Sequence, residues 1–372
     1  MKVLFVTSWY PSTASSIAGI FVREHAKAIS LYNEIIVLYP EIASAKLPIS
    51  DSIEDGLRTI RVFYRVPIKY TTVISQLCAV YKAFCYLRKQ GYIPDIIHSN
   101  THEAGMAGLL LAKLYHRPGV ITEHYSGFIG HSQLTFRQKL LARWAMLQAR
   151  VVMPVSNCLR DGMINLSIKN KFCVIPNVVD TGIFFPLYKE AMNKAQKRIL
   201  FVGLLRPEKG INYLLEALSI IRMNRDDFVL DIVGGSPDYM GCEELTAKLG
   251  LKDKVRFHGI KPKNEVAEFM RQSDFIVIPS LFETFGVVTV EALASGKPVI
   301  ATTTGIALEV ITKERGLLVP PGDINALKNE IEYMLDHFKN YDTKAIAHYA
   351  REKFSYKAVG HQFDMVYKNC IK

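Results

Sequence analysis

Residues 279–302 read PSLFETFGVVTVEALASGKPVIAT, and this stretch decides the fold. The short apolar run Ile276–Ser280 predicts a buried strand, and Val287–Ala294 predicts the helix that follows it. A Ser-Gly-Lys-Pro sequence ends that helix, and Val299–Ala301 predicts the next strand. A strand, a loop, a helix and a second strand in this order form the building unit of a parallel α/β sheet.

Two glutamates, Glu283 and Glu291, are separated by seven residues within this stretch. Glu283 falls on the strand-to-helix loop, and Glu291 is expected about two turns inside the helix. The backbone N–H groups of Phe285, Gly286 and Val287 lie near the start of the helix, where unpaired donors and the helix dipole favour an anion. Carboxylates accept hydrogen bonds from sugar hydroxyls, so the segment suits a phosphate ester of a sugar.

A second string, RILFVGLLRPEKG at residues 198–210, predicts another strand, loop and helix start. The loop carries Arg206 and Lys209. Arg206 can meet a phosphate through its planar guanidinium fork, and Lys209 supplies a compact positive charge. A diphosphate that leaves a sugar gains negative charge in the transition state, so fixed cations at this loop would lower the barrier.

Together the two strings resemble the donor site of the retaining nucleotide-sugar glycosyltransferases of family 4, which have two Rossmann-like domains (the GT-B fold). The glutamate pair is similar to the Glu-x7-Glu signature of that family, and FVGLLRPEKG is similar to its FVGRL-x2-EKG motif, with Leu205 standing before Arg206. The resemblance covers nearly the whole chain. It implies that Glu283 binds the donor sugar, that Glu291 binds the ribose, and that Arg206 and Lys209 bind the phosphates.

The resemblance also implies how transfer proceeds. It offers no enzymic nucleophile, so it implies front-face attack with retention, in which the leaving phosphate accepts the proton of the acceptor. No Asp-x-Asp sequence occurs in the chain, and the string after the first strand lacks GxGxxG. We therefore expect no nicotinamide cofactor and no metal in the chemistry.

Two residues of the N-terminal half are further candidates. Gly19 is expected in the loop after the first strand, where the resembled family brings a glycine loop close to the donor phosphate and the acceptor. His124 ends the strand predicted at Val120–Thr122 and is similar to the histidine of the TxH segment near the reacting sugar. His98 and His102 are competing histidines, of which His98 suits a packing role. The candidate catalytic residues are His124 and Glu283, and the candidate donor-binding residues are Gly19, Arg206, Lys209, Phe285, Gly286, Val287 and Glu291.

The order of the elements predicts the architecture. Strand-like runs alternate with helical stretches in both halves of the 372-residue chain, which favours parallel, doubly wound sheets. The predicted fold is α/β, with two Rossmann-like domains facing across a cleft. The predicted domains are residues 1–185 and 198–353, joined by a linker at 187–197, and residues 354–372 form a terminal helix that, in the resembled family, crosses back to the first domain. The strands predicted in this way are Val3–Thr7, Ile35–Tyr39, Ile60–Phe63, Ile96–His98, Val120–Thr122, Val151–Val155, Val174–Ile175, Arg198–Val202, Phe228–Val233, Val255–His258, Phe275–Pro279 and Val299–Ala301.

Composition and charge limit the classes of partner that the chain can bind. Residues 1–185 carry 20 Lys and Arg against 11 Asp and Glu, whereas residues 186–372 carry 26 against 24. A basic first half predicts an anionic partner, and basic and aromatic residues between Arg58 and Lys89 and between His131 and Arg150 suit an anionic membrane surface. No nucleic-acid-binding motif is present. The start of the chain reads as a strand, and the six cysteines lack metal spacing, so we expect a cytoplasmic protein with free thiols.

These observations predict a retaining glycosyltransferase that transfers a sugar from a nucleotide-diphosphate sugar to a glycan or lipid-linked acceptor in cell-surface polysaccharide or lipopolysaccharide synthesis, on the cytoplasmic side of a membrane. Two other functions stay open at this point. One is a nucleotide-sugar epimerase of similar fold. The other is a non-catalytic sugar-nucleotide-binding subunit, which is consistent with Ala18 and Val178 at positions where the family commonly has glycine.

Overall fold

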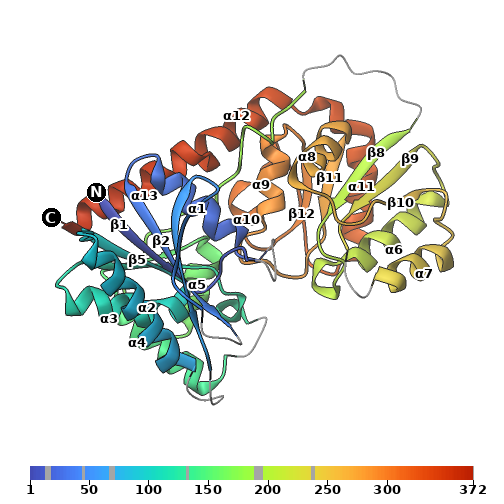
Figure 1. Ribbon diagram of the computed structural model, residues 1–372. Helices are drawn as coiled ribbons and strands as arrows, with labels where there is room; N and C mark the ends of the chain where they lie inside the picture. Colours follow the sequence, from blue (N-terminus) through green and yellow to red (C-terminus); the bar gives the residue numbers. More distant parts are fainter. Residues whose placement is uncertain are drawn as a thin grey trace. The chain divides into compact units, whose positions relative to one another are not determined.

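The computed structural model describes residues 1–12, 18–43, 47–66, 72–130, 134–187, 196–235 and 239–371. The chain divides into two compact units, each with its own sheet (Figure 1). Unit 1 consists of Met1–Val178 together with Tyr356–Lys372, and unit 2 consists of Val179–Ser355. Most of the predicted linker, residues 188–195, lies outside the described residues.

The sheet of unit 1 has seven strands in the order β3-β4-β2-β1-β5-β6-β7. Strand β1 pairs in parallel with β2 on one side and with β5 on the other. The strand order therefore reverses beside β1, and the loops at the carboxyl ends of β1 and β5 border the crevice where such sheets bind ligands. The strands are β1 (Lys2–Thr7), β2 (Glu34–Ile42), β3 (Ser50–Glu54), β4 (Leu57–Tyr64), β5 (Ile96–Asn100), β6 (Gly119–Glu123) and β7 (Val151–Pro154).

The prediction of an all-parallel sheet is wrong at one edge of unit 1. Strand β3 pairs antiparallel with β4, and Asp55-Gly56 connects them with positive φ values of 51° and 83°. Asp-Gly is a strong hairpin signal that the sequence prediction overlooked. Val174–Ile175 is also wrong as a strand: Ile175 donates one backbone hydrogen bond to Pro154, and Pro176 then has no N–H to continue a ladder.

Helices cover both faces of the unit 1 sheet (Figure 1). On one face, α1 (Ile20–Ser30) and α13 (Tyr356–Ile371) share one apolar core with β1, which includes Phe5 and Phe363. On the other face, α2 (Thr72–Lys89) and α3 (Thr101–Leu114) enclose a second core with Leu4 and Ile97. Helix α4 (Phe136–Gln148) packs against α3, and α5 (Asn157–Asn165) follows β7.

The sheet of unit 2 has six strands in the order β10-β9-β8-β11-β12-β13, and every pairing is parallel. These two parallel-sheet α/β units confirm the predicted pair of Rossmann-like domains. The sequence prediction missed only β13, a strand of four residues that follows a loop. The strands are β8 (Lys197–Val202), β9 (Phe228–Val233), β10 (Val255–Phe257), β11 (Phe275–Ile278), β12 (Val299–Thr302) and β13 (Gly316–Val319).

Helices α6 (Ile211–Arg222) and α11 (Ile324–His337) pack against each other and share a core with the strands, including Ile199, Leu230 and Val277. Helix α9 (Val287–Ala294) packs against α12 (Thr343–Phe354). The remaining helices are α7 (Tyr239–Lys248), α8 (Lys263–Gln272) and α10 (Ala307–Val310).

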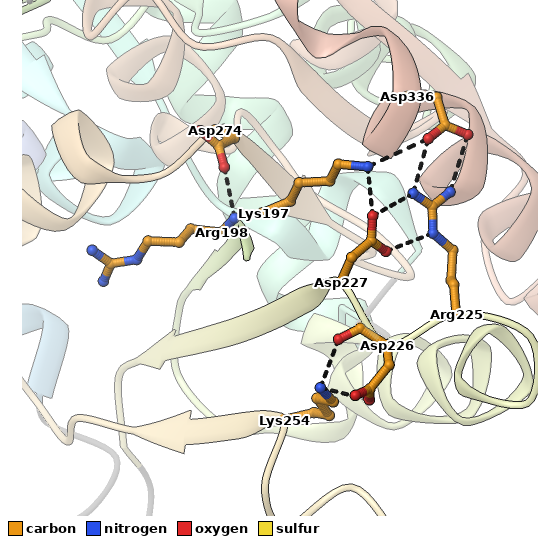
Figure 2. A network of polar contacts seen from close by, with 8 residues as sticks. All are labelled: Lys197, Arg198, Arg225, Asp226, Asp227, Lys254, Asp274 and Asp336. Carbon is orange, nitrogen blue, oxygen red and sulfur yellow. Dashed lines mark hydrogen bonds and ion pairs between the residues drawn. The ribbon is translucent and has the colours of Figure 1, made fainter. Parts of the chain in front are cut away.

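Ion pairs cover the amino edge of the unit 2 sheet, which we define as the edge where its strands begin (Figure 2). Asp227, just before β9, accepts from Lys197 Nζ at 2.6 Å and from Arg225 Nε at 2.8 Å. Arg225 also binds Asp336 at 2.8 Å, at the end of α11. The hydrogen bonds from Arg225 hold the pKa of Asp227 well below its usual range. This network ties two strand starts and a helix end together.

Candidate functional site

The opposite, carboxyl edge of the unit 2 sheet brings two predicted residues together. Lys209 ends the 3₁₀ turn η2 (Pro207–Lys209) after β8, and Glu283 lies in the loop after β11, the strand that pairs with β8. Lys209 Nζ donates to Glu283 Oε1 at 2.6 Å, and Ser280 Oγ donates to the same oxygen at 2.9 Å. The side chains are 27% and 16% exposed, so the pair remains accessible at the edge.

Backbone contacts fix the two loops that carry this pair. The N–H of Leu281 donates to the carbonyl of Glu208 at 2.9 Å. Gly210 has φ +69°, and a Cβ at this position would lie 1.9 Å from the Pro279 carbonyl oxygen. Only glycine allows both the left-handed conformation and the close approach. The spacing between Lys209 and Glu283 therefore depends on the glycine that follows the lysine.

The start of α9 lies beside Glu283 in the chain and is held by a third loop. Gly286 is the N-cap of α9 with φ 82°, and it makes no side-chain cap. Buried Phe285 accepts from the N–H of Ile306 at 2.8 Å, and Gly305 leaves no room for a side chain, since a Cβ there would lie 2.6 Å from the Phe285 carbonyl oxygen. The amides of Val287 and Val288 are orphan donors of this helix N-terminus, whereas Thr289 already donates to the Gly286 carbonyl at 3.0 Å.

Glu291 and Arg206 are placed differently from the pair. The prediction that Glu291 lies two turns inside the helix is wrong: α9 begins at Val287, so Glu291 is one turn in, half-buried on the same short helix. Arg206 is 55% exposed, and its guanidinium lies 3.9 Å from Glu208. The structure thus brings Lys209 to Glu283, and it leaves Arg206 extended at the surface of the same loop.

In unit 1, Gly19 lies against the carboxyl end of β1. It is buried with φ +71°, and a Cβ on it would lie 2.6 Å from the backbone of Trp9 and Tyr10. Gly19 also precedes α1 as its N-cap. A glycine is therefore required here for packing, independently of any ligand.

His124 follows β6 and is buried at the same edge of the unit 1 sheet. Its Nε2 lies 3.4 Å from Asn100 Oδ1, its ring centroid lies 4.6 Å from that of Phe21, and within the described residues its Nδ1 is buried without a hydrogen-bond partner. Burial, followed by the nearby His25 and His98, holds the pKa of His124 well below its ordinary value. His124 is therefore neutral at neutral pH and can act as a hydrogen-bonding group, whereas it is unsuited to act as a fixed cation.

Glu123 is a site residue that the sequence prediction missed. Its carboxylate is fully buried and accepts four hydrogen bonds: Oε2 from the backbone and Nδ1 of His102, each at 2.9 Å, and Oε1 from the N–H groups of His124 and Tyr125, at 2.8 and 2.9 Å. Burial by itself would raise the pKa of Glu123 and lower the pKa of His102. The attraction between the two charged groups outweighs burial, so the pKa of Glu123 is lowered and the pKa of His102 is raised. Glu123 thus holds the backbone of His124 in place. The adjacent Thr101 has φ +68°, a strained value for a β-branched residue.

The competing histidine His98, and His25, which the prediction did not consider, have structural partners. His98 is fully buried between the Tyr367 hydroxyl, at 2.6 Å from Nδ1, and Thr122 Oγ1, at 2.7 Å from Nε2. His25 Nε2 lies 3.0 Å from the carbonyl of Pro176, and burial lowers its pKa to about 4. Among the residues that the structure describes, no three His, Cys, Asp or Glu side chains gather as metal ligands, and all six cysteines are free thiols.

Comparisons with known proteins show the family and the fold of this chain. The family described as "Glycosyl transferases group 1" matches residues 188–353, and "Glycosyltransferase Family 4" matches residues 32–182. An uncharacterized glycosyltransferase of Methanocaldococcus jannaschii is 30% identical over 344 residues, which cover 91% of this chain and 89% of the relative. A capsular polysaccharide biosynthesis glycosyltransferase of Staphylococcus aureus is 26% identical over 332 residues, covering 82% and 85%. The solved structure of HepE from Anabaena in complex with UDP has a TM-score of 0.78 at 19% identity, covering 99% of this chain and all of that chain (100%).

Proposed function

Because the chain belongs to the family 4-type glycosyltransferases with the GT-B fold, we propose that it transfers a hexose from a nucleotide-diphosphate sugar, with retention of anomeric configuration, to a glycan or lipid-linked acceptor. The observation that carries this proposal is the Lys209–Glu283 pair, 2.6 Å apart, on two adjacent loops. The Glu283 loop leads into α9, and Lys209 ends the turn after β8. We propose that this acceptor is used in cell-surface polysaccharide or lipopolysaccharide synthesis, and the capsular relative supports the first of these.

The donor fits the chemistry of the pair. Lys209 Nζ has three N–H donors, of which one is directed to Glu283 Oε1. The other two can donate to the diphosphate, and the second carboxylate oxygen of Glu283 can accept from hydroxyls of the donor sugar. A relative solved with UDP supports a nucleoside diphosphate as the anion. Glu291, one turn into α9, would then accept from the ribose.

Charge stabilisation of the leaving group is the central step. When the bond between the sugar and the diphosphate breaks, negative charge grows on the diphosphate, and Lys209, the exposed Arg206 and the first amides of α9 would stabilise it. We propose that these groups take the place of a divalent metal. Glu283 is already held by Lys209 and Ser280, so it suits binding of the sugar better than nucleophilic attack.

Retention then proceeds by front-face attack, in which the acceptor hydroxyl gives its proton to the leaving phosphate. Neutral His124 is proposed to hydrogen-bond a hydroxyl of the reacting sugar, and its low pKa supports this role because the imidazole retains both a donor and an acceptor nitrogen. Gly19, as the N-cap of α1, is the proposed point of close backbone approach to the donor phosphate.

A lipid-linked acceptor would bring the enzyme to an anionic membrane surface, and we propose that it works at the cytoplasmic face. Among the described residues, no helix is long and apolar enough to cross a bilayer. The excess of basic residues in residues 1–185 supports contact with an anionic surface.

Thermal unfolding with UDP, GDP, ADP and their sugars, each with and without EDTA, tests the donor site. One nucleotide should raise the melting temperature selectively, and EDTA should leave that rise unchanged. If no nucleotide has an effect, the donor site is wrong. The selected sugar nucleotide then serves in a transfer assay in which NMR identifies the anomer of the product. An inverted anomer would overturn the proposal of retention.

A further inference from the structure

The outer surface of α2, α3 and α4 is a candidate for a second binding surface in unit 1. These helices lie next to one another, with α3 in contact with both α2 and α4 (Figure 1). Their inner sides supply core residues such as Phe84, Ala107 and Met146. The exposed residues on their outer sides do not belong to these cores.

Large apolar side chains are exposed along these outer sides. Phe136 is 75% exposed, Ile74 62% and Leu147 59%. On α4, Phe136, Leu140 and Leu147 are spaced by four and seven residues, so they lie on one side of the helix. A helix at the surface of a soluble domain normally turns polar residues outward, so this pattern is unusual. We define the docking face as the exposed large apolar residues of the three helices: Val73, Ile74, Tyr81, Leu110, Leu114, Phe136, Leu140 and Leu147.

Positive charges outnumber negative ones on the three helices that carry the docking face. Helices α2 and α4 contain no acidic residue, and Glu103 is the one acidic residue of α3. The basic residues of the three helices are Lys82, Arg88, Lys89, Lys113, Arg137, Lys139 and Arg143. Two of them have partners: Arg143 donates to the carbonyl of Leu166, and Arg88 lies 5.0 Å from the ring of Tyr115. Neither contact neutralises the positive charge.

Not every residue expected at a membrane surface contributes. Arg61 lies in the basic stretch that the sequence singled out, but its side chain is only 14% exposed and binds Glu41 and Glu54 within the sheet. Lys69 and Tyr70 lie outside the described residues. The positive charge beside the docking face is therefore that of α2, α3 and α4.

We propose that the docking face binds the surface of an anionic bilayer. Exposed Phe and Leu side chains can enter the boundary between headgroups and acyl chains, while flanking Lys and Arg attract anionic headgroups. A second copy of this chain is a poorer occupant because its docking face carries the same positive charge. The benefit for transfer to a lipid-linked acceptor rests on the proposed function, whereas membrane binding itself does not.

Vesicle sedimentation with the full chain tests the inference. Phe136→Glu/Leu140→Glu places two charges at positions that are 75% and 48% exposed, so folding should be retained. Met223→Glu/Met365→Glu is the matched control, because it adds the same charges at positions that are 79% and 46% exposed and lie outside the docking face. Melting temperatures verify that both variants fold. The vesicles contain phosphatidylglycerol with phosphatidylcholine, or phosphatidylcholine alone.

The wild-type chain and the control should bind the anionic vesicles equally, and Phe136→Glu/Leu140→Glu should bind at least about tenfold more weakly. Binding should also fall in 1 M NaCl, where the Debye length shrinks to about 3 Å. Equal binding of all three proteins, equal binding to neutral vesicles, or a dimer in solution that the docking-face variant alone dissociates would each overturn the inference. A nucleotide-induced thermal shift of the same wild-type preparation reports separately on the donor site, so the two proposals can fail independently.

Discussion

The amino and carboxyl edges of the unit 2 sheet carry the same kinds of charged side chain in different arrangements. At the amino edge, Asp227 is shared by Lys197 and Arg225, and Arg225 extends to Asp336 (Figure 2). At the carboxyl edge, a single pair, Lys209 and Glu283, is positioned by glycines that pack against backbone. The first edge joins elements to one another, and the second presents a cation and a carboxylate from two adjacent loops.

This difference shows why ion pairs alone do not identify a functional site. The amino-edge pairs have more partners and similar distances, but they lie on the side of a parallel sheet where ligands do not normally bind. The pair at the carboxyl edge has fewer partners and stands beside a helix N-terminus, where an anion is favoured. The location of the Lys209–Glu283 pair, more than its distances or number of partners, therefore indicates a functional site. Substitutions at the two edges should therefore have opposite effects on turnover and stability.

Glu283→Ala should have the largest effect. Transfer should fall at least about a hundredfold, comparable with the loss of one preorganised polar group from an active site. The melting temperature should change little because Glu283 lies at an accessible edge of the sheet. Initial rates of nucleotide release, together with thermal unfolding, measure both quantities.

Glu265→Ala serves as the control for this substitution, since Glu265 is an exposed glutamate of unit 2 whose partner, Lys261, is four residues away on the surface. It should keep the full rate. If Glu283→Ala also keeps the full rate, Glu283 does not belong to the active site, whatever its contact with Lys209.

Gly210→Ala tests whether the spacing of the carboxyl edge depends on glycine. A methyl group would overlap the Pro279 carbonyl, at 1.9 Å, and the residue would have to keep φ +69°. We expect a loss of about 3 kcal/mol in the free energy of unfolding, from strain and overlap together, with a lower transfer rate as well. Chemical denaturation measures the loss. Gly250→Ala has the same positive φ of 69° but open space around its Cβ, so it isolates the strain from the overlap. Equal losses in the two variants would show that the close approach to Pro279 has no effect.

Much of the fold could be predicted because the strands of unit 2 are short apolar runs bounded by clear helix stops. The failures have physical causes. The β3–β4 hairpin escaped prediction because Ser50–Glu54 alternates polar residues without an apolar face, so only the Asp-Gly turn signals it. Strand β13 reads Gly-Leu-Leu-Val, with a glycine at its start and one β-branched residue, so its composition does not favour a strand as those of β11 and β12 do.

The candidate site could be predicted in part, since Lys209 and Glu283 stand in recognisable strings and the structure brings them together. Glu123 was missed because a glutamate at the end of a strand such as β6 is equally typical of a solvent-exposed residue. Only the structure shows that it is fully buried and accepts four hydrogen bonds. The sequence also could not show that Gly19 must be a glycine because the backbone of Trp9 leaves no room for a side chain.

The carboxyl edge of unit 1 extends the comparison to pH. The pKa of His25 falls from an ordinary value near 6.5 to about 4 in the folded protein because it is buried. Below about pH 6.5, His25 therefore binds a proton in the unfolded chain but stays neutral in the folded chain. The free energy of unfolding consequently decreases as the pH falls. From pH 7 to pH 5, His25 alone should cost about 2 kcal/mol. Denaturant unfolding at the two pH values measures this, and His25→Gln should reduce the difference by that amount. The same pH dependence in both proteins would contradict the assignment.

Asp227→Asn should have the smallest effect and the opposite pattern to Glu283→Ala. The Asp227 side chain is 41% exposed, so solvent screening limits the loss in unfolding free energy to about 1 kcal/mol, and transfer should be unchanged. Because the pKa of Asp227 is lowered in the folded state, its stabilisation is present above about pH 4, the range of an unfolded aspartate, and is lost as the pH falls further. The difference between the two proteins should accordingly shrink toward pH 2 in denaturant unfolding. A drop in transfer at neutral pH would show that the amino edge also positions the active site, and the separation of the two edges into a structural and a functional one would then be wrong.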